Sequence, residues 1–459
     1  MKLTVQEILK VTGGKLIQGN SSEIVTGIST DSRKIQKDEF YLALKGKRFD
    51  GHQFVEEVSQ KAHGVIIENL SIQKILKKNP SLLAILVPNT LKALGDIACA
   101  WRQKFNIPVI AITGSSGKTS TKEMLSLFLS TKGKVCKTEG NLNNLIGLPL
   151  TLFTLNQSHQ FVVLEMGMNA FGEIRRLTQI AQPTIGLITN VGAAHLEGVG
   201  DLDGVARAKG ELFEELDSKA YAVINLDCQR TKNLSTKAQR ITYSIQDQAD
   251  VWVSDIEFSD EKNNFTIHDH TSMTRFSLPV VGFHHLTNFV ASYTVSKLLG
   301  VGVDKIQKAL GQFQPVQMRG EEIQLSFMTI LNDCYNANPD SMKMALENMK
   351  LKFPSRRKIA VLGSMLELGS KADEYHYEVG SDAKKNNVEI LFAYGPSAEK
   401  IQSGFSSSAK NVFVFQENQM DQLLKKLEVK VKKDDVVLIK GSRGMKLERV
   451  LEFFYHQRK

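Results

Sequence analysis

From about residue 106 onward, short apolar runs rich in Val and Ile alternate with longer stretches whose apolar residues recur at helical spacing. Alternation of this kind is typical of βα units arranged around a mostly parallel, buried sheet. The pattern therefore predicts a central α/β domain. Its expected strands are PVIAIT, FVVLEM, PTIGLIT and YAVINLD, and TKEMLSLFLSTKG is an expected helix.

A second series of the same kind begins after about residue 315. Polar helical segments separate its apolar runs, which indicates a further, Rossmann-like domain. No GxGxxG motif opens the series, so the pattern predicts no bound dinucleotide. The expected strands are RKIAVLGSM, VEILFAYG, NVFVFQ and DDVVLIKG.

The residues before 105 predict a smaller unit, in which two strands flank a helix over residues 52–64 that Gly64 closes. Strand-like patterns between residues 250 and 280 predict a small β subsheet in the central domain. We therefore expect an α/β protein of three domains, at residues 1–105, 106–314 and 315–459.

The composition is that of an ordinary globular protein. At 459 residues the chain exceeds what one hydrophobic core normally organises, and its 42% hydrophobic and 23% charged residues exclude disordered and fibrous classes. No apolar run approaches the roughly 18 residues that span a bilayer, and the first residues lack the apolar core of a signal peptide. We expect a cytoplasmic protein with no integral membrane segment.

Neither the cysteines nor the net charge changes this picture. The cysteines are scattered without the spacing of a zinc site or a disulfide framework, which predicts reduced thiols at Cys99, Cys136, Cys228 and Cys334. The formal net charge of +9 comes from basic residues interleaved with acidic ones along the chain. A small anionic substrate explains the sign as well as nucleic acid does, and we expect no nucleic-acid partner.

The strongest chemical motif is TGSSGKTS at residues 113–120, between an expected strand and an expected helix. Gly114 and Gly117 let the backbone curl so that successive N–H groups face inward, and the helix N-terminus adds partial positive charge. In such a turn Lys118 reaches the terminal phosphates of ATP and Thr119 ligates Mg²⁺. The full GxxxxGK[ST] pattern would place glycine at 112, where this chain has Ile112. The alternative is an ordinary Gly/Ser turn at a helix start.

Three further residues follow at positions suited to phosphate and metal chemistry. Glu165 ends an apolar strand, at the edge where open α/β sheets hold ligands. His195 follows the next strand, and Lys209 lies on a predicted helix. Taken singly, each has another explanation: a surface charge, a loop histidine and a solvated helix face.

The motifs together resemble the Mur ligase family over nearly the whole chain. They occur in the family's order: TGSSGKTS, EGNLNNLIGLP, EMGMNAFGEI, NVGAAHLEGVGDLDGVARAKGELF and NDCYNANPDSMK. Within the family, DCYNANP at 333–339 and the AHLEG run look like the member that joins D-alanyl-D-alanine to UDP-N-acetylmuramoyl-tripeptide in peptidoglycan synthesis. No DNPR-type motif, usual in the sibling that adds the third residue, is present.

The resemblance implies catalytic roles for Lys118, Lys209 and Arg319, two Mg²⁺ ions, and a carbamylated lysine at Lys209. The implied metal ligands are Thr119, Glu165, His195 and Lys209. The implied ATP site comprises Thr113, Gly114, Ser115, Ser116, Gly117, Lys118, Thr119, Ser120, Asn288, Arg319 and Asp333. One departure stands in GFHHLTNFVAS, where the family usually has His-Asn and this chain has His284-His285.

The resemblance also implies binding residues for the two substrates. The UDP part is expected at Asp31, Ser32, Arg33, Lys45, Gly46, Asp50, Gly51 and His52. Lys47 and Arg48 beside these glycines also suit a diphosphate, and surface lysine or arginine without a role is the alternative. The peptide or dipeptide is expected near Asn141, Asn144, Asn336, Asn338, Ser442 and Arg443.

The expected reaction activates the tripeptide carboxylate as an acyl phosphate, which the amine of D-alanyl-D-alanine then attacks. Closure of the third domain over the centre is expected to exclude water. One alternative is a sibling ligase that adds a single amino acid, and another is a P-loop ATPase without ligation. A monomer is expected, because three domains can build the site without a partner.

Overall fold

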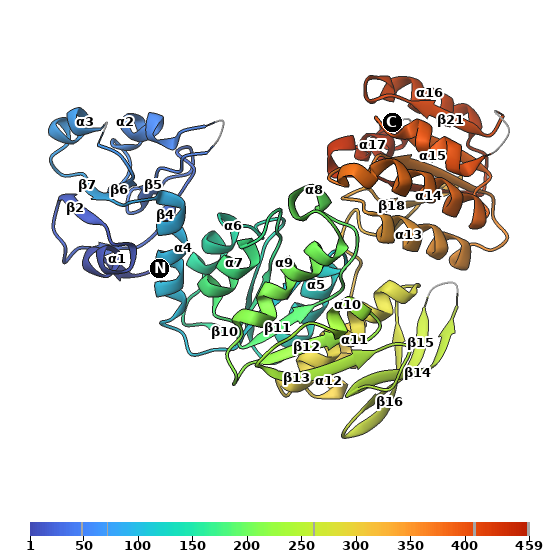
Figure 1. Cartoon of the computed structure of the whole chain (residues 1–459), viewed down its shortest axis with the longest axis horizontal. Coiled ribbons are helices and arrows are strands. Elements are labelled where there is room, and N and C mark those ends of the chain that lie inside the picture. Colours follow the sequence, from blue (N-terminus) through green and yellow to red (C-terminus); the bar gives the residue numbers. More distant parts are fainter. Residues whose placement is uncertain (47–48, 71, 260–261, 407–409, 457–459) are drawn as a thin grey trace.

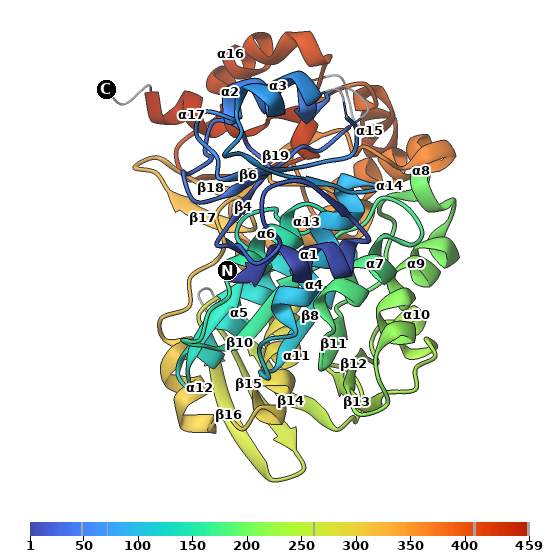
Figure 2. The same cartoon turned by 90° about the vertical axis from the view of Figure 1, so that its left-hand side faces the viewer.

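In the described residues of the computed structural model, three large β-sheets each carry their own helices, and a two-stranded sheet lies in the N-terminal part (Figure 1). The structure describes residues 1–46, 49–70, 72–259, 262–406 and 410–456. The predicted diphosphate residues Lys47 and Arg48 lie outside the described residues. In both views the central sheet lies below the N-terminal and the C-terminal parts (Figure 2). The predicted three-part α/β architecture is confirmed, whereas the boundaries at 105 and 314 stay predictions.

The N-terminal sheet has five strands in the order β2-β7-β6-β5-β4, and β1 pairs with β3 beside it. The strands are β1 (Leu3–Thr4), β2 (Lys15–Gln18), β3 (Ile24–Val25), β4 (Ile28–Ser29), β5 (Phe40–Leu42), β6 (Gly64–Ile67) and β7 (Leu83–Leu86). The helices are α1 (Val5–Thr12), the 3-10 turn η1 (Gly51–Phe54), α2 (Val55–Val58), α3 (Gln73–Lys78) and α4 (Thr90–Arg102).

The predicted helix over residues 52–64 is wrong in its extent. Only η1 and the four-residue α2 form there, and Gly64 begins strand β6 instead of closing a helix. A side chain at Gly64 would meet the Phe40 ring at 2.5 Å, so glycine is required by sheet packing. The helical spacing of Val55 and Val58 reflects burial of this short helix in the core.

The central sheet has nine strands in the order β16-β15-β14-β13-β12-β11-β8-β10-β9, and it is parallel from β9 to β14. The predicted β subsheet is present as β14, β15 and β16, which continue the main sheet in antiparallel pairing. The strands are β8 (Val109–Thr113), β9 (Lys134–Lys137), β10 (His159–Glu165), β11 (Ile185–Ile188), β12 (Tyr221–Asn225), β13 (Gln239–Ser244), β14 (Val251–Phe258), β15 (Asn263–Asp269) and β16 (Ser272–Leu278).

Helices cover both faces of this sheet, as a buried parallel sheet requires. On one face α5 and α11 pack through Phe128 and Phe289, whose ring centroids lie 5.8 Å apart. On the other face α4 joins α6 and α7, and the Trp101 indole N–H donates to the Leu155 carbonyl. The helices are α5 (Lys118–Ser130), α6 (Gly147–Phe153), α7 (Glu173–Ala181), α8 (Leu196–Val199), α9 (Leu202–Glu215), α10 (Gln229–Lys232), α11 (Phe283–Leu298) and α12 (Val303–Leu310).

The C-terminal sheet has six strands in the order β17-β18-β22-β19-β20-β21, and only β17 is antiparallel to its neighbour. The strands are β17 (Glu321–Gln324), β18 (Met328–Asp333), β19 (Lys358–Gly363), β20 (Ile390–Tyr394), β21 (Val412–Phe415) and β22 (Asp435–Lys440). The helices are α13 (Pro339–Lys352), η2 (Gly369–Lys371), α14 (Ala372–Lys385), α15 (Ala398–Phe405), η3 (Glu417–Gln419), α16 (Met420–Lys430), η4 (Arg443–Met445) and α17 (Glu448–His456).

The membrane and cysteine predictions can be compared with the structure. In the part of the chain that the structure describes, no helix has the length and apolar character to cross a membrane. Cys99, Cys136, Cys228 and Cys334 are all free thiols, and Cys136 and Cys334 are buried.

Candidate functional site

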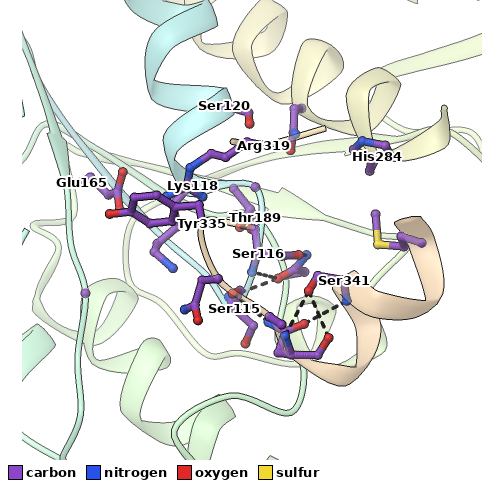
Figure 3. Close-up of a pocket in the computed structure, with 18 of the residues that line it drawn as sticks. Ser115, Ser116, Lys118, Ser120, Glu165, Thr189, His284, Arg319, Tyr335 and Ser341 are labelled. Carbon is purple, nitrogen blue, oxygen red and sulfur yellow. Dashed lines mark hydrogen bonds between the residues drawn. The ribbon is translucent and has the colours of Figure 1, made fainter. Parts of the chain in front are cut away.

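A cavity of about 880 Å³ opens at the carboxyl ends of β8, β10 and β11, where the C-terminal domain meets the central domain. Open α/β sheets hold their ligands at this edge. In Figure 3 the side chains of Lys118, Glu165, Arg319 and Tyr335 gather on one side of the phosphate turn. Two of them come from the central domain and two from the C-terminal segment, so neither domain forms the cavity alone.

The turn at residues 113–120 has the backbone that its glycines predict. Gly114 and Gly117 have φ values of 149° and 78°, and a side chain at Gly114 would lie 1.9 Å from the Thr189 hydroxyl. The Asn190 side-chain oxygen accepts the N–H groups of Ser115 and Ser116 at 3.1 and 2.9 Å. The turn is therefore fixed from outside, by the loop that follows β11.

Helix α5 begins at Lys118, directly after this turn. The first N–H groups of a helix lack partners within it, and those of Lys118 and Thr119 make no hydrogen bond within the described chain. The Lys118 ammonium instead donates to the Gly114 carbonyl at 2.7 Å, so it folds back over the turn. Burial lowers the pKa of Lys118, and Glu165 opposes this shift. The arrangement suits a polyphosphate and makes an ordinary Gly/Ser turn the weaker explanation.

Ile112, which replaces the first glycine of the longer motif, still belongs to strand β8. Its side chain is fully buried in the central core. The turn starts two residues later, at Gly114, so the missing glycine does not alter the conformation of the phosphate turn.

Glu165 is a buried carboxylate at the end of β10, and not a surface charge. Its Oε2 atom accepts the Thr119 hydroxyl at 2.7 Å, and its Oε1 atom accepts the Asn143 amide at 2.8 Å. The three side chains place oxygen atoms directly beside the start of α5. Oxygen ligands of this kind, completed by phosphate and water, are what Mg²⁺ prefers.

His195 lies between β11 and α8 and lines the cavity. Its Nδ1 atom is 2.6 Å from Glu367 Oε2 of the C-terminal segment. The side chain of His195 lowers the pKa of Glu367 by holding the carboxylate in its charged form. Within the described residues no group of three or more His, Cys, Asp or Glu side chains is close enough to hold a metal ion. A cation here would need phosphate oxygens to complete its coordination.

Lys209 lies on α9 and is only 1% exposed, which excludes a solvated helix face. Burial lowers its pKa well below the ordinary value, and the nearby positive charge of Lys118 adds to the effect. No hydrogen-bond acceptor contacts its amine among the residues that the structure describes. A lysine buried in this way loses its proton more readily than an exposed one, and the neutral amine is nucleophilic.

The C-terminal segment supplies Arg319 and Asp333 to the same cavity. The Arg319 guanidinium lies over the Tyr335 ring, 4.0 Å from its centroid. This contact fixes the direction in which the guanidinium N–H groups point. Asp333 forms a 2.6 Å ion pair with the buried Lys440. One oxygen of Asp333 is therefore engaged by lysine, and the carboxylate is held at the cavity wall.

Asn288 lies on α11 and is buried against the phosphate turn. Its Oδ1 atom accepts the Thr121 hydroxyl at 3.2 Å and would touch any side chain at Gly117. His284 and His285, at the start of α11, also line the cavity. Burial lowers the pKa of His284 to about 4 and that of His285 well below its ordinary range. Both imidazoles are neutral at physiological pH.

The residues predicted to bind the peptide or the dipeptide differ in the contacts that they make inside the protein. Asn338 is the N-cap of α13 and accepts the Ser341 N–H, and Asn144 accepts the N–H of Gly147, the first residue of α6. The Asn338 amide also donates to the Ser115 carbonyl at 3.2 Å, across the two domains. Ser442 is buried and accepts the Leu366 N–H, and it does not line the cavity. The candidates that line the cavity are Asn141, Asn144, Asn336, Asn338 and Arg443.

The eight UDP candidates lie in the N-terminal domain and do not line this cavity within the described chain. Arg33 pairs with Asp31 at 2.8 Å and is largely exposed. His52 is committed on both ring nitrogens, to Asp50 Oδ1 at 2.6 Å and to the Glu68 N–H at 3.1 Å. The structure therefore gives His52 a role in shaping its own loop. Ser32, Lys45, Gly46 and Gly51 complete the set, and the backbones of Lys45 and Asp50 form an isolated antiparallel β-bridge.

Sequence reasoning missed several residues that contact the site. Asn143, and not its neighbours, reaches Glu165, and Asn190 holds the phosphate turn. Tyr335 supports Arg319, and Glu367 contacts His195. Asn143 stands in the motif NLNN and Tyr335 in DCYNANP, but nothing in those letters says which side chain points inward.

Comparison with known proteins agrees with this geometry. Three family models match the chain: a Mur ligase family catalytic domain at residues 24–102, a Mur ligase middle domain at 112–296 and a Mur ligase glutamate ligase domain at 318–443. The chain is 34% identical to the UDP-N-acetylmuramoyl-tripeptide–D-alanyl-D-alanine ligase of Bacillus subtilis and 32% identical to that of Escherichia coli. Each match covers 98% of both chains.

Solved structures give the same result. A MurF structure from Acinetobacter baumannii matches with a TM-score of 0.89 and 30% identity over 98% of each chain. MurF ligase from Thermotoga maritima, in complex with ADP, matches with a TM-score of 0.83 and 30% identity over 93% of this chain and 96% of that one.

Proposed function

The chain belongs to the Mur ligase family, and from this premise we propose its reaction. It is an ATP-dependent ligase that joins D-alanyl-D-alanine to the C-terminal carboxylate of UDP-N-acetylmuramoyl-tripeptide. The product is the UDP-muramoyl-pentapeptide of peptidoglycan synthesis, and ADP and phosphate are released. Full-length relatives that carry this activity in their names support the assignment. The observation that carries it is the cavity where Lys118 and Arg319 meet from two domains.

The chemistry explains why ATP is needed. A carboxylate is stabilised by resonance and has no good leaving group, so an amine does not displace its oxygen in neutral water. Attack of the carboxylate on the γ-phosphorus forms an acyl phosphate and releases ADP. The amine of D-alanyl-D-alanine then attacks the acyl carbon, and inorganic phosphate leaves with the C–O bond electrons.

The side chains of this chain act on charge and position. The N–H groups at the start of α5 and the Lys118 ammonium neutralise charge on the transferring phosphoryl group. Lys118 must release the Gly114 carbonyl to do so, a short movement within one turn. Arg319, fixed on Tyr335, approaches the same group from the C-terminal domain. Transfer therefore requires both domains to be docked.

The residues around Glu165 fit Mg²⁺. The Thr119 hydroxyl and the Glu165 carboxylate would hold one ion beside the phosphates, and Asn143 orients that carboxylate. His195 and Lys209 are assigned to a second ion. Mg²⁺ bound there would supply neutralisation of the negative charge of the reacting groups.

Lys209 fits a carbamate. Burial and the nearby Lys118 lower the pKa of its amine, which favours the neutral form that adds to CO₂ to give N-carboxylysine with loss of one proton. The product places a carboxylate where the structure has an amine without an acceptor, and it changes repulsion from Lys118 into attraction. The modification thus removes the electrostatic conflict between Lys209 and Lys118.

The substrate groups are assigned to separate parts of the chain. We assign the UDP group to the N-terminal loop around Lys45 and Gly46, and the peptide ends to the cavity near Asn141, Asn336 and Arg443. Asn288, packed on the phosphate turn, and Asp333 are assigned to the nucleoside side of ATP. Monomeric state and cytoplasmic location stay predictions, and gel filtration with light scattering tests the first.

Phosphate release from ATP tests the assignment. Release should require UDP-muramoyl-tripeptide and D-alanyl-D-alanine together, with pentapeptide found by mass spectrometry. Release with a shorter precursor and one amino acid would make the protein a sibling ligase. Release with ATP alone would make it a simple ATPase.

A further inference from the structure

The loop that follows β19 in the C-terminal domain reaches the segment that carries His195. Glu367 Oε2 lies 2.6 Å from His195 Nδ1, and the Glu367 carbonyl accepts the Glu197 N–H at 3.3 Å. A single residue of the C-terminal domain therefore contacts both a side chain and the backbone of this segment. The reaction described above gives Glu367 no role.

Both partners have unusual backbone conformations. His195 has a φ of 58° and Glu367 a φ of 66°, in the left-handed region that non-glycine residues seldom adopt. Such conformations persist only where the surrounding structure enforces them, and they concentrate at functional sites. Here the two strained residues meet each other across the domain interface.

The Glu367 loop is anchored inside its own domain before it reaches His195. The Met365 N–H donates to Nε2 of the buried His376 at 2.8 Å. The Leu366 N–H donates to the hydroxyl of the buried Ser442 at 2.9 Å. These two contacts, directly before Glu367, hold the loop as a rigid support for its carboxylate.

Stability does not account for the pair. The Glu367 and His195 side chains are 51% and 26% exposed, and exposed ion pairs contribute little to folding. Nδ1 of His195 is buried and has no hydrogen-bond partner among the described residues, and the Glu367 carboxylate is the charged group 2.6 Å from it. A carboxylate only accepts, so the proton between the two groups belongs on Nδ1. The contact then decides which ring nitrogen carries the proton.

We propose that Glu367 is a positioning residue that holds the His195 imidazole in its Nδ1–H form and leaves Nε2 to face a bound cation. A carboxylate behind a metal-binding histidine fixes the ring in this way and raises the basicity of the ligating nitrogen. The inference rests on the proposed function, which assigns His195 to the second ion.

Because Glu367 belongs to the C-terminal domain, it sets the imidazole only while that domain is docked. Two other hydrogen bonds join the C-terminal domain to the central domain. The Asn338 amide donates to the Ser115 carbonyl, and the Asp340 carboxyl group forms a hydrogen bond with the Ala193 backbone. These contacts hold the loops after β8 and β11, on either side of the phosphate turn. Docking of the domain and preparation of the cation site are thus one event.

The direct test is the tautomer of His195. Protein labelled with ¹⁵N-histidine is studied by long-range ¹H–¹⁵N NMR at alkaline pH without substrates, and His195→Gln identifies the resonance. The wild type should show protonated Nδ1, whereas free histidine favours protonated Nε2. Glu367→Ala should revert to the Nε2–H form, and Glu367→Gln should keep Nδ1–H because its amide oxygen still accepts. Glu374→Ala, an exposed glutamate on α14, is the control and should match the wild type.

Cation binding gives a second readout. In the presence of ADP, Mn²⁺ binding followed by EPR should weaken about 10-fold in Glu367→Ala, and Glu374→Ala should bind as the wild type does. An unchanged tautomer in Glu367→Ala, or unchanged Mn²⁺ affinity, would overturn the inference. Either result leaves the ligase assignment intact, because that assignment is judged by pentapeptide formation with the unmodified protein.

Discussion

The Thr119 hydroxyl donates a hydrogen bond to Glu165 Oε2 at 2.7 Å and so joins the first turn of α5 to the end of β10. The two residues are 46 positions apart in the sequence, and both are buried. A hydroxyl and a carboxylate in contact at a helix N-terminus form one oxygen-rich corner beside the phosphate turn. The first prediction tests this corner.

Thr119→Ala and Glu165→Gln should each raise the Mg²⁺ concentration for half-maximal activity by about 10-fold. Because the two groups would hold the same ion, the double variant should cost clearly less than the product of the two effects. Mg²⁺ titration of phosphate release measures all three. Thr131→Ala, at the far end of the same helix, is the control. Independent, multiplicative effects would argue against a shared ion.

Lys118→Ala should lower kcat by roughly 10²- to 10³-fold or more, since it removes charge stabilisation of the transferring phosphoryl group. Steady-state phosphate release with both substrates checks this result. Lys219→Ala removes an exposed lysine of the same domain and should leave kcat unchanged. Near-normal ligation by Lys118→Ala would remove the phosphate-turn assignment.

Lys209→Ala should lose most activity and recover part of it when formate or acetate is added, because a small carboxylate can replace the carbamate. The ligation rate at increasing acetate concentration measures the rescue, with Lys219→Ala as the unresponsive control. Full activity of Lys209→Ala without added carboxylate would rule out the modification.

Gly114→Ala should abolish ATP binding and destabilise the protein. Its φ of 149° and the 1.9 Å approach to the Thr189 hydroxyl leave no room for a methyl group. Gly302→Ala is the matched control, since nothing lies within 4 Å of the added carbon there. Calorimetric titration with ATP and thermal unfolding compare the two variants. Equal behaviour would show that the turn adapts to a side chain.

Stability should fall as pH decreases below about 6.5. Burial lowers the pKa of His376 and of His285, and lowers that of His284 to about 4. Below the unfolded value of 6.5 the unfolded chain therefore binds more protons, and each group weakens folding by up to about 1.4 kcal/mol per pH unit until its folded pKa is reached. Above pH 7.5 these groups should have no effect.

Scanning calorimetry at several pH values checks this dependence, and His376→Gln isolates one contribution. The glutamine oxygen can still accept the Met365 N–H but cannot take up a proton, so the slope below pH 6.5 should decrease. An identical slope in the variant would show that His376 does not contribute.

The sequence by itself determined the phosphate turn and many of the strands. The central parallel strands β8, β10, β11 and β12 follow from apolar runs, because burial on both faces leaves little freedom in residue type. The strands β9 and β13 carry polar and charged residues and were not predicted. TGSSGKTS predicted its own conformation, since Gly114 and Gly117 occupy backbone regions that other residues avoid. The prediction that Glu165 ends a strand is confirmed, because a charged residue directly follows the apolar run of β10.

Only the tertiary structure decided which side chains meet. The NLNN motif gives no reason to prefer Asn143 over Asn144, yet Asn143 bonds Glu165, while Asn144 accepts the Gly147 N–H at the start of α6. The burial of Lys209 and the contact of His195 with Glu367 depend on packing between distant segments. Periodicity and turn chemistry act over a few neighbouring residues, whereas these contacts arise only when separate elements pack together, so no local pattern encodes them.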